Sequence, residues 1–258
     1  MTAELMKAPA AARSLRAEWA RLADAAAPPG RFAADLVASL PEPARRWLIH
    51  AVAAGTPLWP TVQLTMRGRI RIGAWRPFTA RQLLAPPHGF IWAATARVVG
   101  LPLTGFDRYS SGTGQMRWRL LGLIPVMTGA GPDVTRSAAG RLAGEGICWL
   151  PTAFAGAVWA AGPEPDTAVA SWRIGDADES VRLRVGPDGA LQEVLMQRWG
   201  NPDGQPFGRY PFGVAVEAER TFGGVTMPSA LRAGWWWGTD RQEAGEFFRA
   251  EVTDATFR

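Results

Sequence analysis

The sequence predicts an α+β protein in which a few helices pack on a largely antiparallel sheet. The clearest strand is Thr61–Ile72, where apolar side chains alternate without interruption with Gln, Thr and Arg. A period of two is typical of a strand with one buried face and one face toward water or a ligand. Shorter stretches with the same alternation follow it, separated by turn residues, with no low-complexity linker and no fixed-period repeat. The chain therefore predicts one sheet-based domain.

Composition supports a folded core and gives little evidence for nucleic-acid binding. Of the 258 residues, 47% are hydrophobic and 20% are charged, so a sizeable core is expected. Lys7 is the only lysine among 28 basic residues, which indicates a genome rich in G and C that favours arginine codons. The arginines are scattered without a basic run, so the net charge of +5 does not predict a nucleic-acid partner.

Few residues suit metal or redox chemistry. Cys148 is the only cysteine, which excludes a disulfide framework and favours a reducing compartment. His50 and His88 are expected on a helix and in a turn, so no metal site is predicted. The sequence has no nucleotide-binding or nucleophile-elbow motif, so no cofactor is expected. It shows neither a signal peptide nor a run of about 18 apolar residues, and we expect a cytoplasmic protein without stable membrane insertion.

The N-terminal part is predicted to be helical. An Ala-rich amphipathic helix is expected over residues 3–27, with an apolar stripe that docks on the domain or on a partner. A second helix is expected at about 31–39, and a third from Pro43 to about Ala54, with Pro at its favoured first position. The expected boundaries are 1–40 for a helical extension and 41–258 for a single domain.

A meander of strands is expected to follow the first strand. Gly73–Pro77 has the composition of a turn or bulge, and residues 122–151 depart from the strand pattern. A helix is expected there from Asp133 or Thr135, either of which can cap it, to about Ile147. The joints between later strands carry Pro, Asp and Gly where tight turns require them. The further strands expected are Phe78–Leu84, Phe90–Val99, Leu103–Tyr109, Gln115–Leu121, Ala168–Ile174, Ser180–Val185, Leu191–Trp199, Phe212–Arg220, Thr226–Trp237 and Phe247–Phe257.

Several motifs carry a resemblance to known families. RGRIRIGAWRPFTARQ, GFIWAA, GLPLTGFDRYSSGTGQMRWRLLGLIPV and GPDVTRSAAGRLAGEGICWLPTA occur in that order. From about Leu40 to the C-terminus the chain resembles a bacterial, actinobacterial-type family of unassigned function. The closing FGGVTMP motif, with the long strand and EVTD sequence after it, resembles the end of the Lol-type lipoprotein carriers. This resemblance implies a curved, open half-barrel sheet with a helix on its concave face, able to hold an apolar molecule. Because no export signal is seen, lipoprotein trafficking is not implied.

Arg141 and Glu145 form the most prominent polar pair. They lie one helical turn apart and can pair. If their helix fills a half-barrel, Glu145 becomes a candidate acid/base in a low-dielectric interior, with Arg141 setting its ionisation and Tyr109 donating a hydrogen bond. A structural ion pair that ties the helix to the sheet is the commoner use of such residues. The three residues are therefore catalytic candidates only if the protein is an enzyme.

Arginine and aromatic residues are the candidates for ligand binding. Arg76 and the cluster Asp107–Tyr109 could bind an acidic head group or form a bracing network, and both alternatives stay open. There are 13 Trp residues, and three successive ones at Trp235–Trp237 must put at least one on the non-core face of a strand. A helix, a ligand or a partner must then cover that face. The candidate ligand-binding residues are Trp75, Arg76, Trp92, Asp107, Trp118, Trp149, Trp235 and Trp237.

Three functions are consistent with this pattern. The first is binding of a hydrophobic small molecule in the half-barrel, with any acidic group held by arginine. The second is an enzyme of specialised metabolism that uses the same pocket with Glu145 as acid/base. The third is an interaction module whose aromatic strands or N-terminal helices dock a partner. The open edges of a half-barrel also allow a homodimer.

Overall fold

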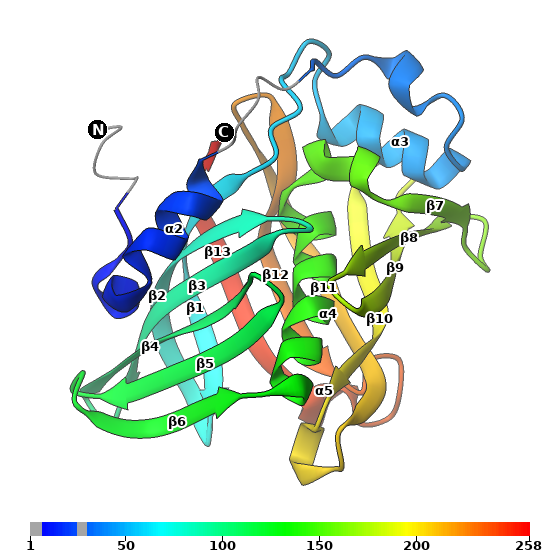
Figure 1. Cartoon of the computed structure of the whole chain (residues 1–258). Helices are drawn as coiled ribbons and strands as arrows, with labels where there is room; N and C mark the ends of the chain where they lie inside the picture. The colour runs from blue at the N-terminus through cyan, green and yellow to red at the C-terminus, as the bar shows by residue number, and fades with distance from the viewer. Residues whose placement is uncertain (1–6, 25–29) are drawn as a thin grey trace.

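The computed structural model describes residues 7–24 and 30–258. Within those residues the main element is an antiparallel sheet of 13 strands, in the order β6-β5-β4-β3-β2-β1-β13-β12-β11-β10-β9-β8-β7 (Figure 1). The strands are β1 Val62–Ile72, β2 Ala74–Ala85, β3 Gly89–Val98, β4 Leu101–Ser110, β5 Thr113–Leu120, β6 Ile124–Ala130, β7 Val158–Ala161, β8 Thr167–Ile174, β9 Ala177–Val185, β10 Leu191–Gly200, β11 Gly208–Phe222, β12 Val225–Trp235 and β13 Glu246–Phe257. The helices are η1 Ala10–Leu15, α2 Arg16–Ala23, η2 Ala34–Val37, α3 Glu42–Ala51, α4 Pro132–Trp149, η3 Pro151–Gly156, η4 Pro202–Gly204 and α5 Gln242–Gly245, where η marks a 3₁₀ helix.

The sheet is built from two meanders joined at its centre. Strands β1–β6 form the first wing and β7–β13 the second wing, and the two wings meet where β1 pairs with β13. Strands β6 and β7 lie at the two ends of the order, so the sheet is not closed. This confirms the predicted fold class, an α+β protein with a curved, open half-barrel sheet, N-terminal helices and a helix over the concave face.

Helix α4 is the connection between the two wings. It follows β6 at one edge of the sheet and leads through η3 to β7 at the other edge, so it must cross the concave face (Figure 1). It packs against β4 and β5 of the first wing and against β9 and β10 of the second. The helix predicted up to about Ile147 is thus confirmed, but neither Asp133 nor Thr135 caps it, because Gly131 is the N-cap residue and Pro132 occupies the favoured first turn.

Strand β1 shows how the alternation fixes the two faces of the sheet. Val62, Leu64 and Met66 are buried in the inner core, whereas Arg67 and Arg69 on the opposite face are exposed. Residues that pair across neighbouring strands face the same side of the sheet, so the register with β2 and β13 determines which of their side chains point inward and which point outward.

Two predicted segments are shorter in the structure than the sequence indicated. The predicted turn Gly73–Pro77 is strand from Ala74 onward, since Gly73 at φ 67° makes the turn by itself and Ile72 pairs with Ala74. The helix predicted at 31–39 is limited to the single 3₁₀ turn Ala34–Val37.

The edge strands of the sheet and the end of one strand also differ from the prediction. Strands β6 and β7 were not predicted, because an edge strand has only one neighbour and needs no buried alternating face. The strand predicted to reach Trp237 ends at Trp235, where Trp236 adopts φ 61° and turns the chain.

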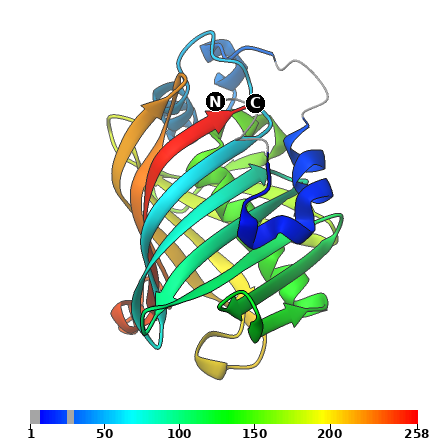
Figure 2. The same cartoon turned by 90° about the vertical axis from the view of Figure 1, so that its left-hand side faces the viewer.

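The N-terminal segment packs on the outside of the first wing. Figure 2 shows this helical segment against the outer side of the sheet. Trp19 and Leu22 of α2 are buried with Leu83, Ile91 and Phe106 in a second core on the convex face. The predicted helix over residues 3–27 is interrupted, because Ala12 within η1 has non-helical dihedrals and the α-helix begins only at Arg16. Residues 3–6 and 25–27 of that prediction lie outside the described residues. No helix in the described parts of the chain is long and apolar enough to cross a membrane.

Replacing Trp19 with Ala tests whether the N-terminal segment is part of the folded unit. Because the Trp19 side chain is fully buried against the convex face, Trp19→Ala should reduce the free energy of unfolding by about 3 kcal/mol. Urea denaturation monitored by circular dichroism measures this. The control Leu36→Ala, at a residue that is half exposed, should change it by less than about 0.5 kcal/mol. Equal effects of the two variants would mean that the segment is not docked.

Candidate functional site

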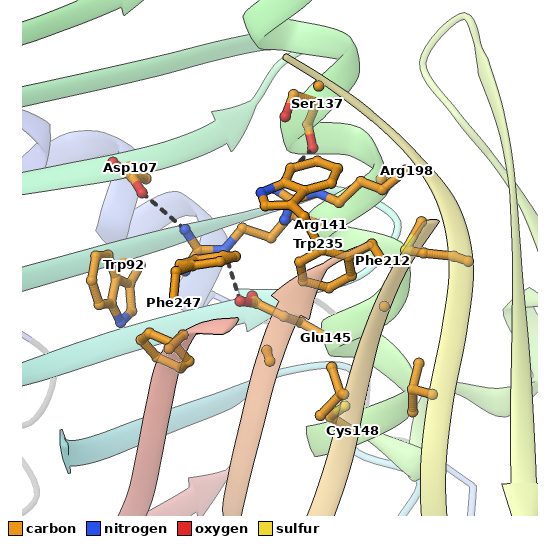
Figure 3. Close-up of a pocket in the computed structure, with 18 of the residues that line it drawn as sticks. Trp92, Asp107, Ser137, Arg141, Glu145, Cys148, Arg198, Phe212, Trp235 and Phe247 are labelled. Atoms are coloured by element: carbon orange, nitrogen blue, oxygen red, sulfur yellow. Dashed lines mark hydrogen bonds and ion pairs between the residues drawn. The ribbon is translucent and has the colours of Figure 1, made fainter. Parts of the chain in front are cut away.

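A cavity of about 330 Å³ lies on the concave face between α4 and the second wing (Figure 3). Its floor comes from the inward-facing residues of β10–β13 and from Ile70 of β1, and α4 covers it. Most of its lining is apolar. The apolar lining residues are Ile70, Trp92, Met116, Cys148, Trp149, Val194, Met196, Phe212, Val214, Leu231, Ala233, Trp235, Phe247 and Phe248, and the polar ones are Asp107, Ser137, Arg141, Glu145, Arg198 and Asn201.

Small residues allow the helix and the large side chains to approach each other. A Cβ on Gly140 would lie 3.3 Å from Cγ of Arg198, and one on Gly144 would lie 3.4 Å from the sulfur of Met196. On the sheet, a Cβ on Gly200 would lie 2.4 Å from the ring of Trp235. These glycines let long side chains of the second wing fit beneath α4, and they therefore help to set the shape of the cavity.

A charged network closes the cavity on the side of the first wing. Arg141 of α4 donates to Glu145 Oε1 at 2.7 Å and to Asp107 Oδ2 at 3.0 Å, and its guanidinium lies over the rings of Phe90 and Trp92 (Figure 3). Gln82, which is fully buried on β2, donates to Glu145 Oε2. Two side chains of the helix, Arg141 and Glu145, are thus bonded to Gln82 on β2 and to Asp107 on β4.

The electrostatics of this network keep Arg141 charged. Burial by itself lowers the pKa of Arg141, but the charges and hydrogen bonds of Glu145 and Asp107 outweigh burial, so its pKa is raised. Both oxygens of Glu145 accept hydrogen bonds, one from Arg141 and one from Gln82. The pair predicted from the sequence therefore exists and holds the helix to the sheet.

Arg198 on β10 is a second guanidinium in the cavity, and sequence reasoning did not single it out. It lies over the rings of Phe212 and Trp235, and its Nη2 donates only a long bond of 3.4 Å to the carbonyl of Ser137. Its Nε is buried without an acceptor, and among the described residues no carboxylate lies within ion-pair distance of it. Arg198 is therefore a buried cation that forms no ion pair within the described part of the chain.

The surroundings of Arg198 also lower its pKa. Burial is the largest cause and the positive charge of Arg141 adds to it, and together they lower the pKa to about 10. Arg198 is still cationic at neutral pH. The period of two along β10 could have identified it, because Arg198 falls on the same face as Val194 and Met196, where a core residue is expected.

Six of the residues predicted from the sequence are brought together at the cavity. They are Trp92, Asp107, Arg141, Glu145, Trp149 and Trp235. Trp118 lies behind them, where its Nε1 donates to Asp107 at 2.9 Å and its ring lies 5.6 Å from that of Trp92. It holds the carboxylate and the indole of two lining residues in place.

Four other predicted residues lie elsewhere. Trp75 is on the convex face of β2, beneath the guanidinium of Arg249. Trp237 covers Gly213 on the outer face and donates to Glu193. Arg76 points to the inner face but does not line the cavity. Tyr109 reaches the turn at Gly175 instead, and burial, with the nearby charge of Asp176, raises its pKa.

The cavity shows no metal chemistry within the described residues. No group of three or more His, Cys, Asp and Glu side chains in residues 7–24 and 30–258 could hold a metal ion. Cys148 lines the cavity as a free thiol, and burial, with the charge of Glu145, raises its pKa well above the usual range. The thiol is therefore protonated and acts as part of the apolar wall.

Comparison with known proteins gives a family and two structural likenesses. A model for a family of unknown function (DUF6544) matches residues 30–247. A search of curated proteins finds no match. A domain assigned as an outer membrane lipoprotein-sorting protein from Vibrio parahaemolyticus is similar in structure at 9% identity and a TM-score of 0.45, covering 88% of this chain and 94% of that one. A LolA superfamily protein from Nitrosomonas europaea matches at 10% identity and a TM-score of 0.41, covering 77% and 85%. The Lol-type resemblance seen in the sequence is thus also found in the comparison of folds.

Replacing Arg141 with Gln tests the network. Arg141→Gln removes the guanidinium that pairs with both Asp107 and Glu145 in a mostly buried site, so the free energy of unfolding should fall by about 3 kcal/mol. The control Arg173→Gln removes an ion pair with Asp178 that is exposed on both sides and should cost less than about 0.5 kcal/mol. Denaturant unfolding at neutral pH gives both values. A small effect at Arg141 would show that the network does not secure α4.

Proposed function

Because this chain belongs to DUF6544, a family of unknown function, we propose its function from its own geometry: it binds a hydrophobic small molecule with an acidic group in the cavity beneath α4. The observation that carries this proposal is the cavity itself. Its volume of about 330 Å³ lies in the range of small-molecule sites, about 300–1,000 Å³, and its wall is mainly aliphatic and aromatic. Apolar surface of that kind is favourably removed from water by an apolar ligand.

The acidic group of the ligand is assigned to Arg198. A carboxylate is the natural partner of a guanidinium, and the charge-assisted hydrogen bonds between them are about twice as strong as neutral ones. Arg141 is less suited to bind the acidic group, because its guanidinium already forms ion pairs with Asp107 and Glu145. The anion therefore binds on the β10 side of the cavity, where no described residue forms an ion pair with Arg198, and the apolar part extends along Val214, Leu231 and Ala233.

The geometry favours binding over the two alternatives. For an enzyme with Glu145 as acid/base, both carboxylate oxygens are occupied by donors, and Tyr109 does not line the cavity. For an interaction module that uses the N-terminal helix, the apolar side of α2 is already covered by the convex face of the sheet. The single cysteine favours a reducing compartment, and we therefore propose that the protein is located in the cytoplasm.

Dodecanoate is a suitable probe of the cavity. Native mass spectrometry should show one dodecanoate bound per chain, and binding should change the tryptophan fluorescence because Trp92, Trp149 and Trp235 line the site. Ala233→Leu places extra carbons in the cavity and should weaken binding by roughly tenfold. The matched control Ala230→Leu adds the same bulk on the outward-facing side of β12 and should bind as the wild type does. Equal affinity in both variants would refute the cavity as the site.

The contribution of Arg198 is tested by comparing dodecanoate with dodecanol. The wild type should prefer the anion by about tenfold or more, and Arg198→Gln should abolish that preference while dodecanol binding persists. Because the pKa of Arg198 is lowered to about 10, the preference should be present at neutral pH and lost as the pH rises past about 10. Arg173→Gln, on the outer face, should leave the preference intact. An Arg198→Gln protein that still prefers the anion would show that another group binds it.

A further inference from the structure

The first wing has an unusual distribution of charge and exposed apolar residues, independent of the cavity. Residues 62–130, which span β1–β6, contain nine arginines and a single acidic residue, Asp107, which faces inward to Arg141. In the described structure, six of these arginines form no ion pair with a carboxylate. They are Arg69, Arg71, Arg76, Arg97, Arg117 and Arg119.

The second wing does not share this property. Most of its arginines lie within ion-pair distance of an acidic side chain. They are Arg173, Arg182, Arg184, Arg209, Arg232, Arg241 and Arg249. The positive charge of the protein is therefore concentrated, without compensation, on the first wing, which gives it a basic face suited to an anionic partner.

Apolar side chains are exposed on the same wing, mainly around two neighbouring hairpin turns. We call this set the turn patch. It consists of Val99, Leu101, Leu121, Leu123, Ile124, Val126 and Met127. Val99 is 82% exposed and Leu123 is 77% exposed, and the two turns are joined by a hydrogen bond from the Leu121 amide to the Pro102 carbonyl. So many large apolar side chains in one exposed group indicate an interaction surface.

The backbone of these turns strengthens the argument. Val99 and Leu121 have φ of 49° and 55° and each precedes a glycine at positive φ, the arrangement of a hairpin turn that favours Asn or Asp at this position. At the opposite end of the first wing, the turn with the same dihedrals uses Ser111 before its glycine. A β-branched valine at positive φ is strained. The two apolar residues are thus unfavourable both for the turn and for contact with water.

We propose that the turn patch and those unpaired arginines that lie on the outer face, which excludes Arg76, dock the protein on an anionic phospholipid bilayer. Val99, Leu121 and Leu123 enter the interfacial region, and arginines of the outer face lie against the lipid phosphates. Apolar insertion combined with several basic residues is the pair of signals that gives firm but reversible attachment. In the second wing, acidic Asp203 lies in η4 and acidic Asp240 lies between β12 and α5, so the first wing makes the contact.

The topology also relates this surface to the cavity. In an antiparallel meander, the turns after β1, β3 and β5 fall at the same end of the sheet (Figure 1). The cavity lies toward that end, since it is lined by Ile70 near the end of β1, by Trp235 at the end of β12 and by Phe247 at the start of β13. A docked protein would hold its cavity toward the bilayer. The docking proposal nevertheless stands without the proposed ligand, because no cavity residue takes part in it.

A double variant separates membrane binding from folding. Val99→Asn with Leu121→Asn gives both turns the Asn-Gly sequence that they favour, so thermal stability should stay the same or rise. Binding to vesicles of phosphatidylcholine mixed with phosphatidylglycerol, measured by co-sedimentation, should weaken by roughly tenfold or more. The control Val158→Asn, at an exposed apolar residue on β7, should bind as the wild type does.

The charge contribution is tested on the same vesicles. Arg69→Gln and Arg97→Gln should each weaken binding by about fivefold and reduce its salt dependence, whereas Arg220→Gln on β11 should not. Vesicles of phosphatidylcholine without the anionic lipid should bind much less. The proposal is overturned if the wild type does not prefer anionic vesicles. It is also overturned if light scattering shows a dimer that Val99→Asn with Leu121→Asn makes monomeric while vesicle binding is absent, since the patch would then join two copies of the chain.

Discussion

The path of α4 across the concave face is the constraint on which the rest of the structure depends. Because the two meanders end at opposite edges of the sheet, the segment between β6 and β7 has to cross the interior. That crossing takes Arg141 and Glu145 out of water, and charges in such a place are tolerated only when they are paired and hydrogen-bonded. Asp107 and Gln82 supply the partners from the first wing. Trp199 adds a tie to the second wing, where its Nε1 donates to Asp133 at the start of the helix.

The cavity follows from the same crossing, because the two wings meet the helix differently. Toward the first wing, the packed rings of Trp92 and Trp118, which are tilted to each other, and the charged network fill the space. Toward the second wing, glycines on α4 face long side chains, and a space remains that the protein does not fill. Arg198 borders that space, and its guanidinium lies over two aromatic rings instead of beside a carboxylate. A buried cation without a counter-charge is costly to keep, and an anionic ligand would remove that cost.

The sequence predicted those parts of the fold in which a periodic pattern reflects burial on one side. Strand β1 and helix α4 were placed to within a few residues because each presents a continuous buried face. Prediction failed where tertiary context decides. Gly73 turned the chain by itself, and β6, exposed along almost its whole length, has no pattern of burial to detect. The Arg141–Glu145 pair was visible from its spacing, whereas its partners Asp107 and Gln82 come from distant strands.

Tryptophan content shows how far composition can mislead about a site. Trp235, Trp236 and Trp237 are adjacent in sequence, yet they face the cavity, the guanidinium of Arg241 and the outer face over Gly213. The turn at Trp236 separates them, so what the sequence presents as one aromatic cluster serves three surfaces. For charge, in contrast, composition showed too little. The net charge of the sequence predicted no nucleic-acid partner. Once each carboxylate is assigned to the arginine with which it pairs, however, the remaining positive charge lies on the first wing. The distribution of uncompensated charge, which only the fold defines, therefore says more about partners than the total does.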